Sequence, residues 1–266
     1  MVGGGLVAFD QPQGAVGADL DPPRPGARRI LGTFKDRNPD AAAVKVEPQK
    51  AAGALLFVGA AQFFVGLLLA EALYPGYSIS GNYISDLGAY CPQSNAWTNY
   101  AGPCVVHQPT AIIFDSSVFL LGLFVAVAAY LFSRSVGRNV FSVLLVLTGV
   151  GAMGVGVFPE TAPLAHELTS DVAFIFAALA AVWSYRLVKA PLNYFSGILG
   201  AVSLAAIVLD EANVTAGLGV GGIERMIVYP VIVWAVGFGA YAMAPGLRVP
   251  PGPFPPSAPE WTGPSP

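Results

Sequence analysis

The chain of 266 residues has 55% hydrophobic residues, only 11% charged residues, a mean hydropathy of +0.62 and a net charge of -3. A soluble domain carries about 25% charged residues, so this composition excludes an ordinary soluble protein and indicates an integral membrane protein. A nucleic-acid partner is excluded as well, because no clustered basic stripe occurs outside the N-terminal region.

Residues 1–50 differ from the rest of the chain, because Gly, Pro and Ala alternate there with scattered charges. No periodic apolar face runs through them, so we expect a disordered cytoplasmic tail. The opening MVGGGLVAF is too short and too rich in glycine for a signal peptide. The hydrophobic architecture requires nothing before about Val44.

Six segments are apolar enough to cross the ~30 Å hydrocarbon layer of a membrane, which takes about 20 residues. They are residues 51–74, 111–132, 140–158, 168–187, 192–209 and 226–244. We therefore predict an all-α membrane protein, with a bundle of six transmembrane helices in residues 51–246 and an ordered outer loop between the first two helices. Residues 247–266 are rich in proline and are expected to form a second cytoplasmic tail.

The distribution of Lys and Arg orients this bundle, since short cytoplasmic loops carry an excess of both. Twelve of the thirteen basic residues lie on the side that holds both ends of the chain. The exception is Arg225, at the start of the last segment, where we expect it and the adjacent Glu224 to neutralise each other. The prediction is a multi-pass protein of the cell membrane with both termini in the cytoplasm.

The outer helix ends carry nine acidic residues and both histidines. The acids are Glu71, Asp86, Asp115, Glu160, Glu167, Asp171, Asp210, Glu211 and Glu224. Solvation in the headgroup layer accounts for most of them, because ionisable groups cost little at helix ends. Asp115 and Asp171 lie deeper, about one turn inside their helices, and Ser170 follows His166 by one turn. We expect these four residues to share an outer cavity, since acids at that depth face the bundle or water.

The first outer loop contains Cys91 and Cys104, and oxidation is permitted on that side of the membrane. A disulfide between them is the favoured interpretation, since a metal site would need pairs of cysteines at short spacing. Another outer loop contains Asn213-Val214-Thr215, which makes Asn213 a candidate for glycosylation.

The third and sixth segments carry two signals for packing. Glycines 149, 151, 154 and 156 in the third would let neighbouring helices approach closely, so we expect this helix to be central. Pro230 is expected to kink the sixth and so to help open a cavity on the outer side.

Four motifs resemble one family of prokaryotic, largely archaeal, membrane proteins. NYISDLG at residues 82–88, IFDSS at residues 113–117, GVFPE at residues 156–160 and His166 are similar to the family catalogued as domain of unknown function 998. The resemblance covers about residues 51–244. More distantly, the Ile-Ser-Asp-x-Gly element is similar to that of DRAM and Sfk-type six-helix proteins, some of whose relatives are involved in lipid remodelling of membrane anchors.

The resemblance implies six helices with both ends in the cytoplasm, and it implies no activity. The family often has Asn where this chain has Asp115, which counts against a mechanism that needs a carboxylate there. The interpretation that we favour is therefore a non-enzymatic scaffold, or a component that binds lipids or a protein partner, with a polar site at the outer face. Membrane lipids are the expected partners, together with a second copy of the chain or another membrane protein.

The alternative is a lipid-active hydrolase or transferase at the outer face. Ser85 or Ser116 would be the nucleophile and His166 the base, with one aspartate orienting the imidazole. The candidate catalytic residues are Ser85, Asp86, Asp115, Ser116, His166 and Asp171.

Two absences count against this enzyme. The chain has no G-x-S-x-G motif, and HELTS at residues 166–170 has Ser where a zinc protease would have its second histidine. We predict no metal or cofactor, and the weak metal candidates are His107, His166 and Glu167. A transport pathway is disfavoured too, because no ionisable residue lies at mid-membrane in the six segments.

Overall fold

The computed structural model describes residues 47–96, 99–100, 102–135 and 139–244. Nearly all of the two predicted tails lies outside these ranges. The six helices are α1 (Pro48–Leu73), α2 (Thr110–Ser135), α3 (Val140–Val157), α4 (Pro163–Ser184), α5 (Leu192–Glu211) and α6 (Val220–Met243). Within the described residues, each of the six is long and apolar enough to cross a membrane. The predicted six-helix membrane bundle is confirmed.

Two helices, α4 and α6, begin more than four residues earlier than the hydropathy suggested. α4 begins at Pro163, because proline is favoured in the first turn of a helix, where its missing N–H is not needed. α6 begins at Val220, directly after Gly219. As a result His166, Glu224 and Arg225 lie inside helices rather than in loops.

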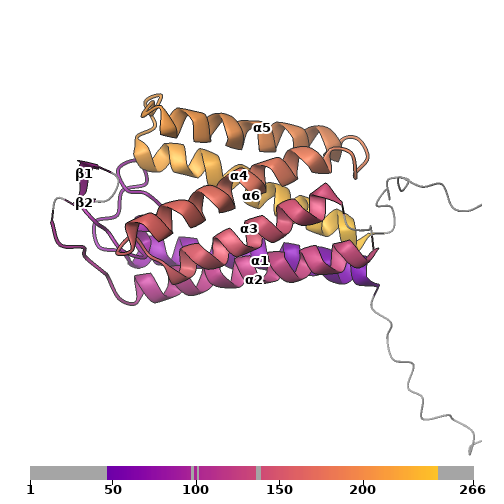
Figure 1. Ribbon diagram of the computed structural model, residues 1–266, viewed down its shortest axis with the longest axis horizontal. Coiled ribbons are helices and arrows are strands. Elements are labelled where there is room, and N and C mark those ends of the chain that lie inside the picture. The colour runs from indigo at the N-terminus through magenta and orange to yellow at the C-terminus, as the bar shows by residue number, and fades with distance from the viewer. Residues whose placement is uncertain (1–46, 97–98, 101, 136–138, 245–266) are drawn as a thin grey trace, which may run out of the picture. The chain divides into compact units, whose positions relative to one another are not determined.

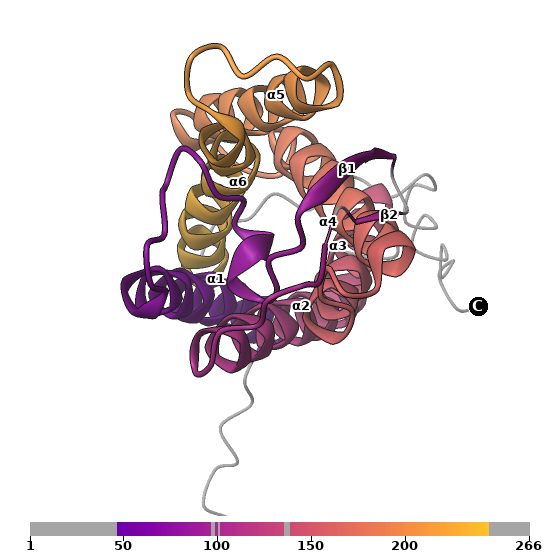
Figure 2. The same ribbon diagram turned by 90° about the vertical axis from the view of Figure 1, so that its left-hand side faces the viewer.

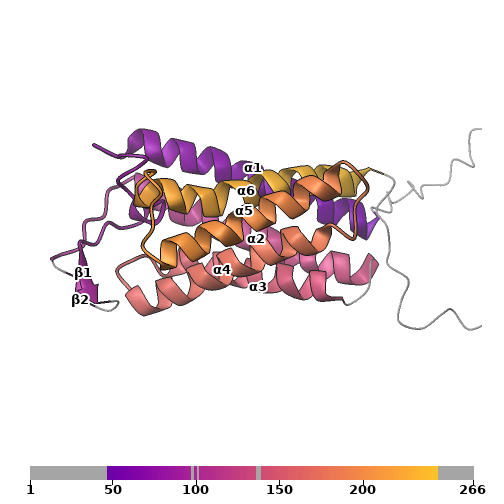
Figure 3. The same cartoon turned by 90° about the horizontal axis from the view of Figure 1, so that it is seen from above.

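The helices run up and down in chain order and form a ring (Figures 1 and 2). Each helix packs against the next one, α6 returns to pack against α1, and α5 lies at the periphery against α4 and α6 (Figure 3). We use "loop end" for the end of the bundle that holds residues 74–96, 99–100, 102–109, 158–162 and 212–219. The opposite end holds residues 185–191, the start of α1 and the end of α6.

The glycines of α3 produce close helix contacts, as predicted. A Cβ atom added to Gly149 would lie 2.7 Å from the backbone O of Gly122 on α2, and one added to Gly151 would lie 2.5 Å from the backbone N of Ala173 on α4. The expectation that α3 is the central helix is wrong. The most buried helix is α6. In α6, 56% of an apolar stretch of 18 residues is buried, whereas 39% of the corresponding stretch of α3 is buried.

An aromatic cluster fills the bundle near the opposite end. The rings of Phe132, Phe141, Trp234 and Phe238 lie 5.1 to 6.4 Å apart in tilted or edge-on pairs, which are geometries that aromatic quadrupoles favour. Trp234 also donates a hydrogen bond of 2.9 Å from Nε1 to Ser184 Oγ. This cluster joins α2, α3, α4 and α6.

α6 continues through Pro230, which has no N–H for the helix ladder. A hydroxyl group on the neighbouring helix α5 hydrogen-bonds to the α6 backbone near this proline, since Ser203 Oγ donates to the backbone O of Ile227 at 2.8 Å. Such contacts help membrane helices to tolerate proline.

The loop between α1 and α2 contains the predicted disulfide between Cys91 and Cys104. Next to it, Tyr90 and Val105 form an antiparallel bridge. The loop also holds the short helix η2 (Ser85–Leu87) and the antiparallel strands β1 (Gln93–Ala96) and β2 (Asn99–Tyr100). The disulfide and the bridge close the part of the loop that projects beyond the helices.

Candidate functional site

Residues 77–91, which we term the plug segment, turn back into the ring of helices at the loop end. Figure 2 looks at this end and shows η2 in the middle of the ring. Ile84 and residues 86–89 are buried, with Asp86 only 4% exposed and Leu87 not exposed at all. The sequence ISDLG therefore forms part of the interior rather than a surface loop.

Local side-chain contacts explain why the plug segment takes this shape. The side-chain amide of Asn82 both accepts and donates a hydrogen bond. Its Oδ1 accepts from the backbone N of Ser78 at 3.1 Å, and its Nδ2 donates to Asp86 Oδ2 at 2.8 Å. The same Oδ2 accepts from the backbone N of Tyr83 at 3.0 Å. Asn and Asp commonly fix turns through such bonds to nearby backbone. Burial nevertheless raises the pKa of Asp86, against the effect of these hydrogen bonds.

Glycines lie where the plug segment meets its neighbours closely. A Cβ atom on Gly88 would lie 2.6 Å from Asp115 Oδ1, and one on Gly221 at the start of α6 would lie 2.0 Å from the backbone O of Asn82. Asp115 Oδ1 is buried and has no hydrogen-bond partner among the described residues. Asp115 thus lies against the end of the ISDLG motif, and it contributes no hydrogen bond to that motif through Oδ1.

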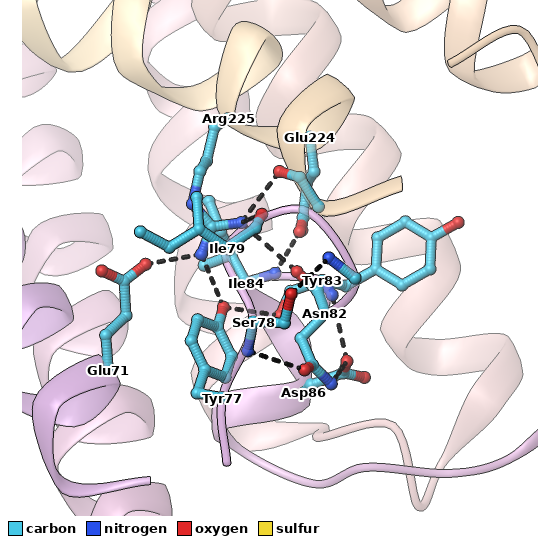
Figure 4. Close-up of polar contacts among 12 residues, drawn as sticks. Glu71, Tyr77, Ser78, Ile79, Asn82, Tyr83, Ile84, Asp86, Glu224 and Arg225 are labelled. Atoms are coloured by element: carbon cyan, nitrogen blue, oxygen red, sulfur yellow. Dashed lines mark hydrogen bonds and ion pairs between the residues drawn. The ribbon is translucent and has the colours of Figure 1, made fainter. Parts of the chain in front are cut away.

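Arg225 on α6 joins three parts of the chain (Figure 4). It pairs with Glu71 of α1 at 2.5 Å, and it donates to Tyr77 Oη at 2.7 Å and to the backbone O of Ile79 at 2.9 Å. Only 5% of Arg225 is exposed. The expectation that Arg225 pairs with Glu224 is wrong: its ion-pair partner is Glu71, because the guanidinium extends toward α1 and the plug segment.

Glu224, one turn inside α6, is buried on the other side of the plug segment, with 6% of its surface exposed. It accepts a hydrogen bond from the backbone N of Ile84, the residue that precedes η2. No cation among the described residues lies within ion-pair distance of its carboxylate, since the two ion pairs there join Glu47 to Lys50 and Glu71 to Arg225.

Glu160, in the connection from α3 to α4, holds the plug segment from a third direction. It accepts from Ser85 Oγ at 2.6 Å and from the backbone N of Cys91 at 3.4 Å. Burial raises the pKa of Glu160 to about 7, although both hydrogen bonds act to lower it. Glu160 and Glu224 stood out in the sequence only as two of nine outer acids. The GVFPE motif that ends at Glu160 was the one signal for its importance.

A cavity of about 90 Å³ lies in the ring below the plug segment. Ile84 and Ser85 line it from above, and Trp234 lines it on the side of the aromatic cluster. α1, α2, α3, α4 and α6 supply the rest of the lining, which is apolar except for Ser85, Thr148, Ser170 and Glu224.

The structure brings together only part of the predicted shared cavity. Ser170 lines it, and His166 lies beside Ser170, with His166 Nε2 at 3.4 Å from Ser170 Oγ. The other ring nitrogen, Nδ1, lies 2.8 Å from the backbone O of Phe158. Asp115 and Asp171 are not among the residues of the lining, and Asp115 lies against Gly88 instead.

The remaining catalytic and metal candidates lie in different surroundings. Ser116 is exposed on α2, and Glu167 is exposed on α4. The His107 ring stacks edge-on against Tyr74 with centroids 4.5 Å apart. In the part of the chain that the structure describes, no three His, Cys, Asp or Glu side chains gather as a metal site requires. Asn213 is exposed at the loop end, between α5 and α6.

Comparison with known proteins gives one match. No curated protein and no solved structure matches the chain. Residues 57–241, which include all six helices in whole or in part, match the model of the family described as protein of unknown function DUF998. The match spans more than half of the chain and contains the plug segment and the residues that hold it, and the chain belongs to this family.

Proposed function

We propose that this membrane protein binds the hydrocarbon chain of a membrane lipid in the cavity between its helices, as a binding component rather than an enzyme. The observation that carries the proposal is the cavity, whose lining is almost wholly apolar. Apolar cavities in proteins stay dry and accept apolar molecules. In a bilayer the surrounding apolar molecules are lipid chains.

The length of the cavity supports a chain from one leaflet. Its lining on α6 runs from Glu224 to Ala235, and on α2 from Phe114 to Val125. Eleven residues of helix span ~16 Å, at about 1.5 Å per residue. The hydrocarbon layer is ~30 Å thick, so a cavity of this length matches the depth of one leaflet.

The lining also supports one orientation of the lipid. Ser85 and Glu224 lie at the loop end of the cavity, and Trp234 lies deeper in the bundle. The polar end of a lipid would therefore meet the plug segment, and its chain would point toward the aromatic cluster. The charge distribution supports a loop end that faces the outside of the cell, with the lipid drawn from the outer leaflet.

Trp234 offers a direct test, because it lines the cavity and is only 4% exposed. Phe replaces the tryptophans at positions 97, 183 and 261, so that Trp234 is the sole fluorophore. The purified protein is titrated with a single-chain lipid brominated near the end of its chain, since bromine quenches indole fluorescence on contact. We expect saturable quenching, with weaker quenching when the bromine lies next to the headgroup.

Cavity-filling variants provide the control. Ala177→Leu combined with Ala235→Leu adds bulk at two lining positions, whereas Ala205→Leu adds the same group on the exposed face of α5. The first change should abolish saturable quenching and the second should leave it intact. Equal quenching in the filled variant and its parent would refute lipid binding in the cavity.

One contact favours a second candidate, an acyl hydrolase or transferase in the same cavity. Ser170 Oγ lies 3.4 Å from His166 Nε2, and the backbone O of Phe158 lies at Nδ1, where it would fix the tautomer. Ser170 Oγ would attack the carbonyl carbon of an acyl ester while His166 takes its proton, and the ester bond would break as His166 returns that proton to the departing alcohol. Labelling with a fluorophosphonate tests this candidate: label at Ser170 that is lost in His166→Gln supports it, and an unlabelled Ser170 excludes it.

A further inference from the structure

One carboxyl group at the loop end of the cavity uses only one of its two oxygens within the protein. Glu224 lines the cavity and is 6% exposed. Its Oε2 accepts a hydrogen bond from the backbone N of Ile84. Its Oε1 has no hydrogen-bond partner among the described residues, and it is not one of the fully enclosed unpaired atoms of that part of the chain. Oε1 is therefore accessible to a molecule in the cavity.

The surroundings of Glu224 favour its neutral, protonated form. A charged carboxylate in an apolar cavity costs far more free energy than a carboxylic acid does. Two further acids lie close by, since the next residue of the plug segment, Ser85, donates to Glu160, and Asp86 follows it. Negative charges so close together oppose one another, which adds to the effect of burial.

Arg225 attracts a negative charge on Glu224, but other groups already engage its guanidinium. It pairs with Glu71, and it donates to Tyr77 Oη and to backbone carbonyls of the plug segment and α6. Arg225 is also absent from the lining of the cavity. Burial therefore decides the charge of Glu224, and the cavity meets it as a carboxylic acid.

A protonated Glu224 is a hydrogen-bond donor toward the cavity. A carboxylic acid has one O–H group and one carbonyl oxygen. Since Oε2 accepts from Ile84 N, the proton lies on Oε1, the oxygen without a partner in the described chain. A donor without a partner is costly in apolar surroundings. A bound molecule that brings an acceptor to this point thus binds more tightly than a plain hydrocarbon.

We propose that the cavity selects lipid chains that begin at an uncharged oxygen acceptor, an ester carbonyl or an ether oxygen, which accepts a hydrogen bond from Glu224. This inference rests on the proposed binding of a lipid chain. In both kinds of lipid the oxygen lies directly at the start of the hydrocarbon chain, and Glu224 lies where the apolar lining meets the plug segment. An anionic head would be buried beside acids, and a cationic head would pair with Glu224 only after Glu224 had lost its proton.

The test uses the protein with Trp234 as its sole tryptophan and four probes that share one brominated chain. The probes are a methyl ester, a methyl ether, an alkane and a primary amine, each titrated in the same neutral detergent and corrected for its partition into that detergent. The ester, the ether or both should bind about three- to tenfold more tightly than the alkane, as one neutral hydrogen bond predicts. The ratio of ester to ether affinity distinguishes the two kinds of lipid.

The probes also separate this proposal from the binding of a chain. Equal affinity for the ester, the ether and the alkane would overturn the selection of an acceptor and leave chain binding intact. Tightest binding of the amine would show that Glu224 is charged and would overturn it as well. No quenching by any of the four probes would refute chain binding itself.

Matched variants assign the preference to the donor on Glu224. Glu224→Gln is neutral, keeps an oxygen to accept from Ile84 N and donates through its amide, whereas Glu224→Met has no donor. Glu211→Met removes an exposed acid at the same end, outside the cavity lining. The preference for the ester or the ether over the alkane should persist in Glu224→Gln and Glu211→Met and disappear in Glu224→Met.

Alkane binding in each variant reports that the cavity is still formed. A preference that is lost in Glu224→Gln, or kept in Glu224→Met, would overturn the donor role of Glu224. If Glu224→Met no longer binds the alkane, the comparison of Glu224→Gln with its parent decides the question, because a role that needs a charged carboxylate does not survive that change.

Discussion

The raised pKa of Glu160 predicts that the docking of the plug segment depends on pH. Its pKa rises from an ordinary value of 4.5 to about 7 in the folded protein, so the folded state binds the proton more tightly than the unfolded state. A group of this kind contributes its full stability below about pH 4.5, and the contribution is lost as pH rises through about 7. The loss is about 3 kcal/mol when the shift is converted at 1.36 kcal/mol per unit.

Hydrogen exchange measures this effect. Backbone amides of residues 84–91, corrected for their intrinsic rates, should be better protected at about pH 6 than at about pH 8. Glu160→Gln cannot ionise and still accepts from Ser85 Oγ, so its protection should change much less between the two values. Glu211→Gln, at an exposed site, is the control. Protection that rises with pH would contradict the prediction.

The pair of Arg225 and Glu71 gives a second prediction at the level of residues. Arg225→Met should lower the free energy of unfolding by about 3 to 5 kcal/mol, because it leaves Glu71 without its partner in a buried position. The double change Arg225→Met with Glu71→Met should recover much of that loss. Unfolding titrations with sodium dodecyl sulfate would measure both, and a double variant as unstable as the single one would show that Arg225 acts mainly through Tyr77 and the carbonyls.

The sequence predicted which residue types matter at this site but not their pairs. Asp86 and Ser85 were identified, because ISDLG is a polar element between two apolar segments. Glu160 and Glu224 were missed as individual residues, because each lies more than 70 positions from its partner in the plug segment. Contacts over that separation leave no periodic pattern, whereas the i to i+4 relation between His166 and Ser170 does.

Among the helices, the crossing of α2 and α3 gives a prediction on glycine. Gly149→Ala should destabilise the bundle by about 1 to 3 kcal/mol, since the added Cβ would meet backbone atoms of Gly122 and Ala126 at 2.7 Å. Gly237→Ala on α6 is the matched control, because the nearest atom would be a side-chain carbon of Leu192 at 3.8 Å. The control should be neutral or stabilising by up to about 1 kcal/mol.

The same unfolding titration compares the two variants. An equal gain of stability in both would show that helix propensity, and not close packing, determines the response to alanine. Intact stability in both would mean that α2 and α3 separate at little cost.

Helix number was predictable from hydropathy, whereas helix starts and helix burial were not. His166 and Glu224 lie near the starts of α4 and α6, and their polarity made the predicted apolar segments begin too late. Glycine content pointed to α3 as central, but α6 is the more buried helix. Small residues report how closely two helices approach, and they do not report how many neighbours a helix has.

For the whole molecule, the remaining prediction concerns orientation. Cys91 and Cys104 are joined, so a single new cysteine reports on its own position. Ala216→Cys at the exposed loop end should react with a membrane-impermeant maleimide on intact cells, and Ala190→Cys, exposed at the opposite end, should react only after lysis. The reverse pattern would place both chain ends outside and would contradict the charge distribution.

Hydropathy and charge predicted the bundle and its expected orientation, because both depend on composition along the chain. The ring and the cavity could not be predicted in this way. They depend on α6 returning to α1 and on side chains such as Phe114, Ala177 and Trp234 facing one another, which no single segment encodes.

The contacts between the plug segment and α6 also bear on biosynthesis. Ile79, Asn82 and Ile84 bond to Arg225 and Glu224, which lie about 140 positions later in the chain. Chains are made from the N-terminus, so the plug segment emerges long before these partners are synthesised. Until α6 enters the membrane, the plug segment lacks those hydrogen bonds and Glu71 lacks its arginine. A chain released before residue 220 would keep these polar groups unpaired, which marks it as unfinished to any quality-control protease that recognises them.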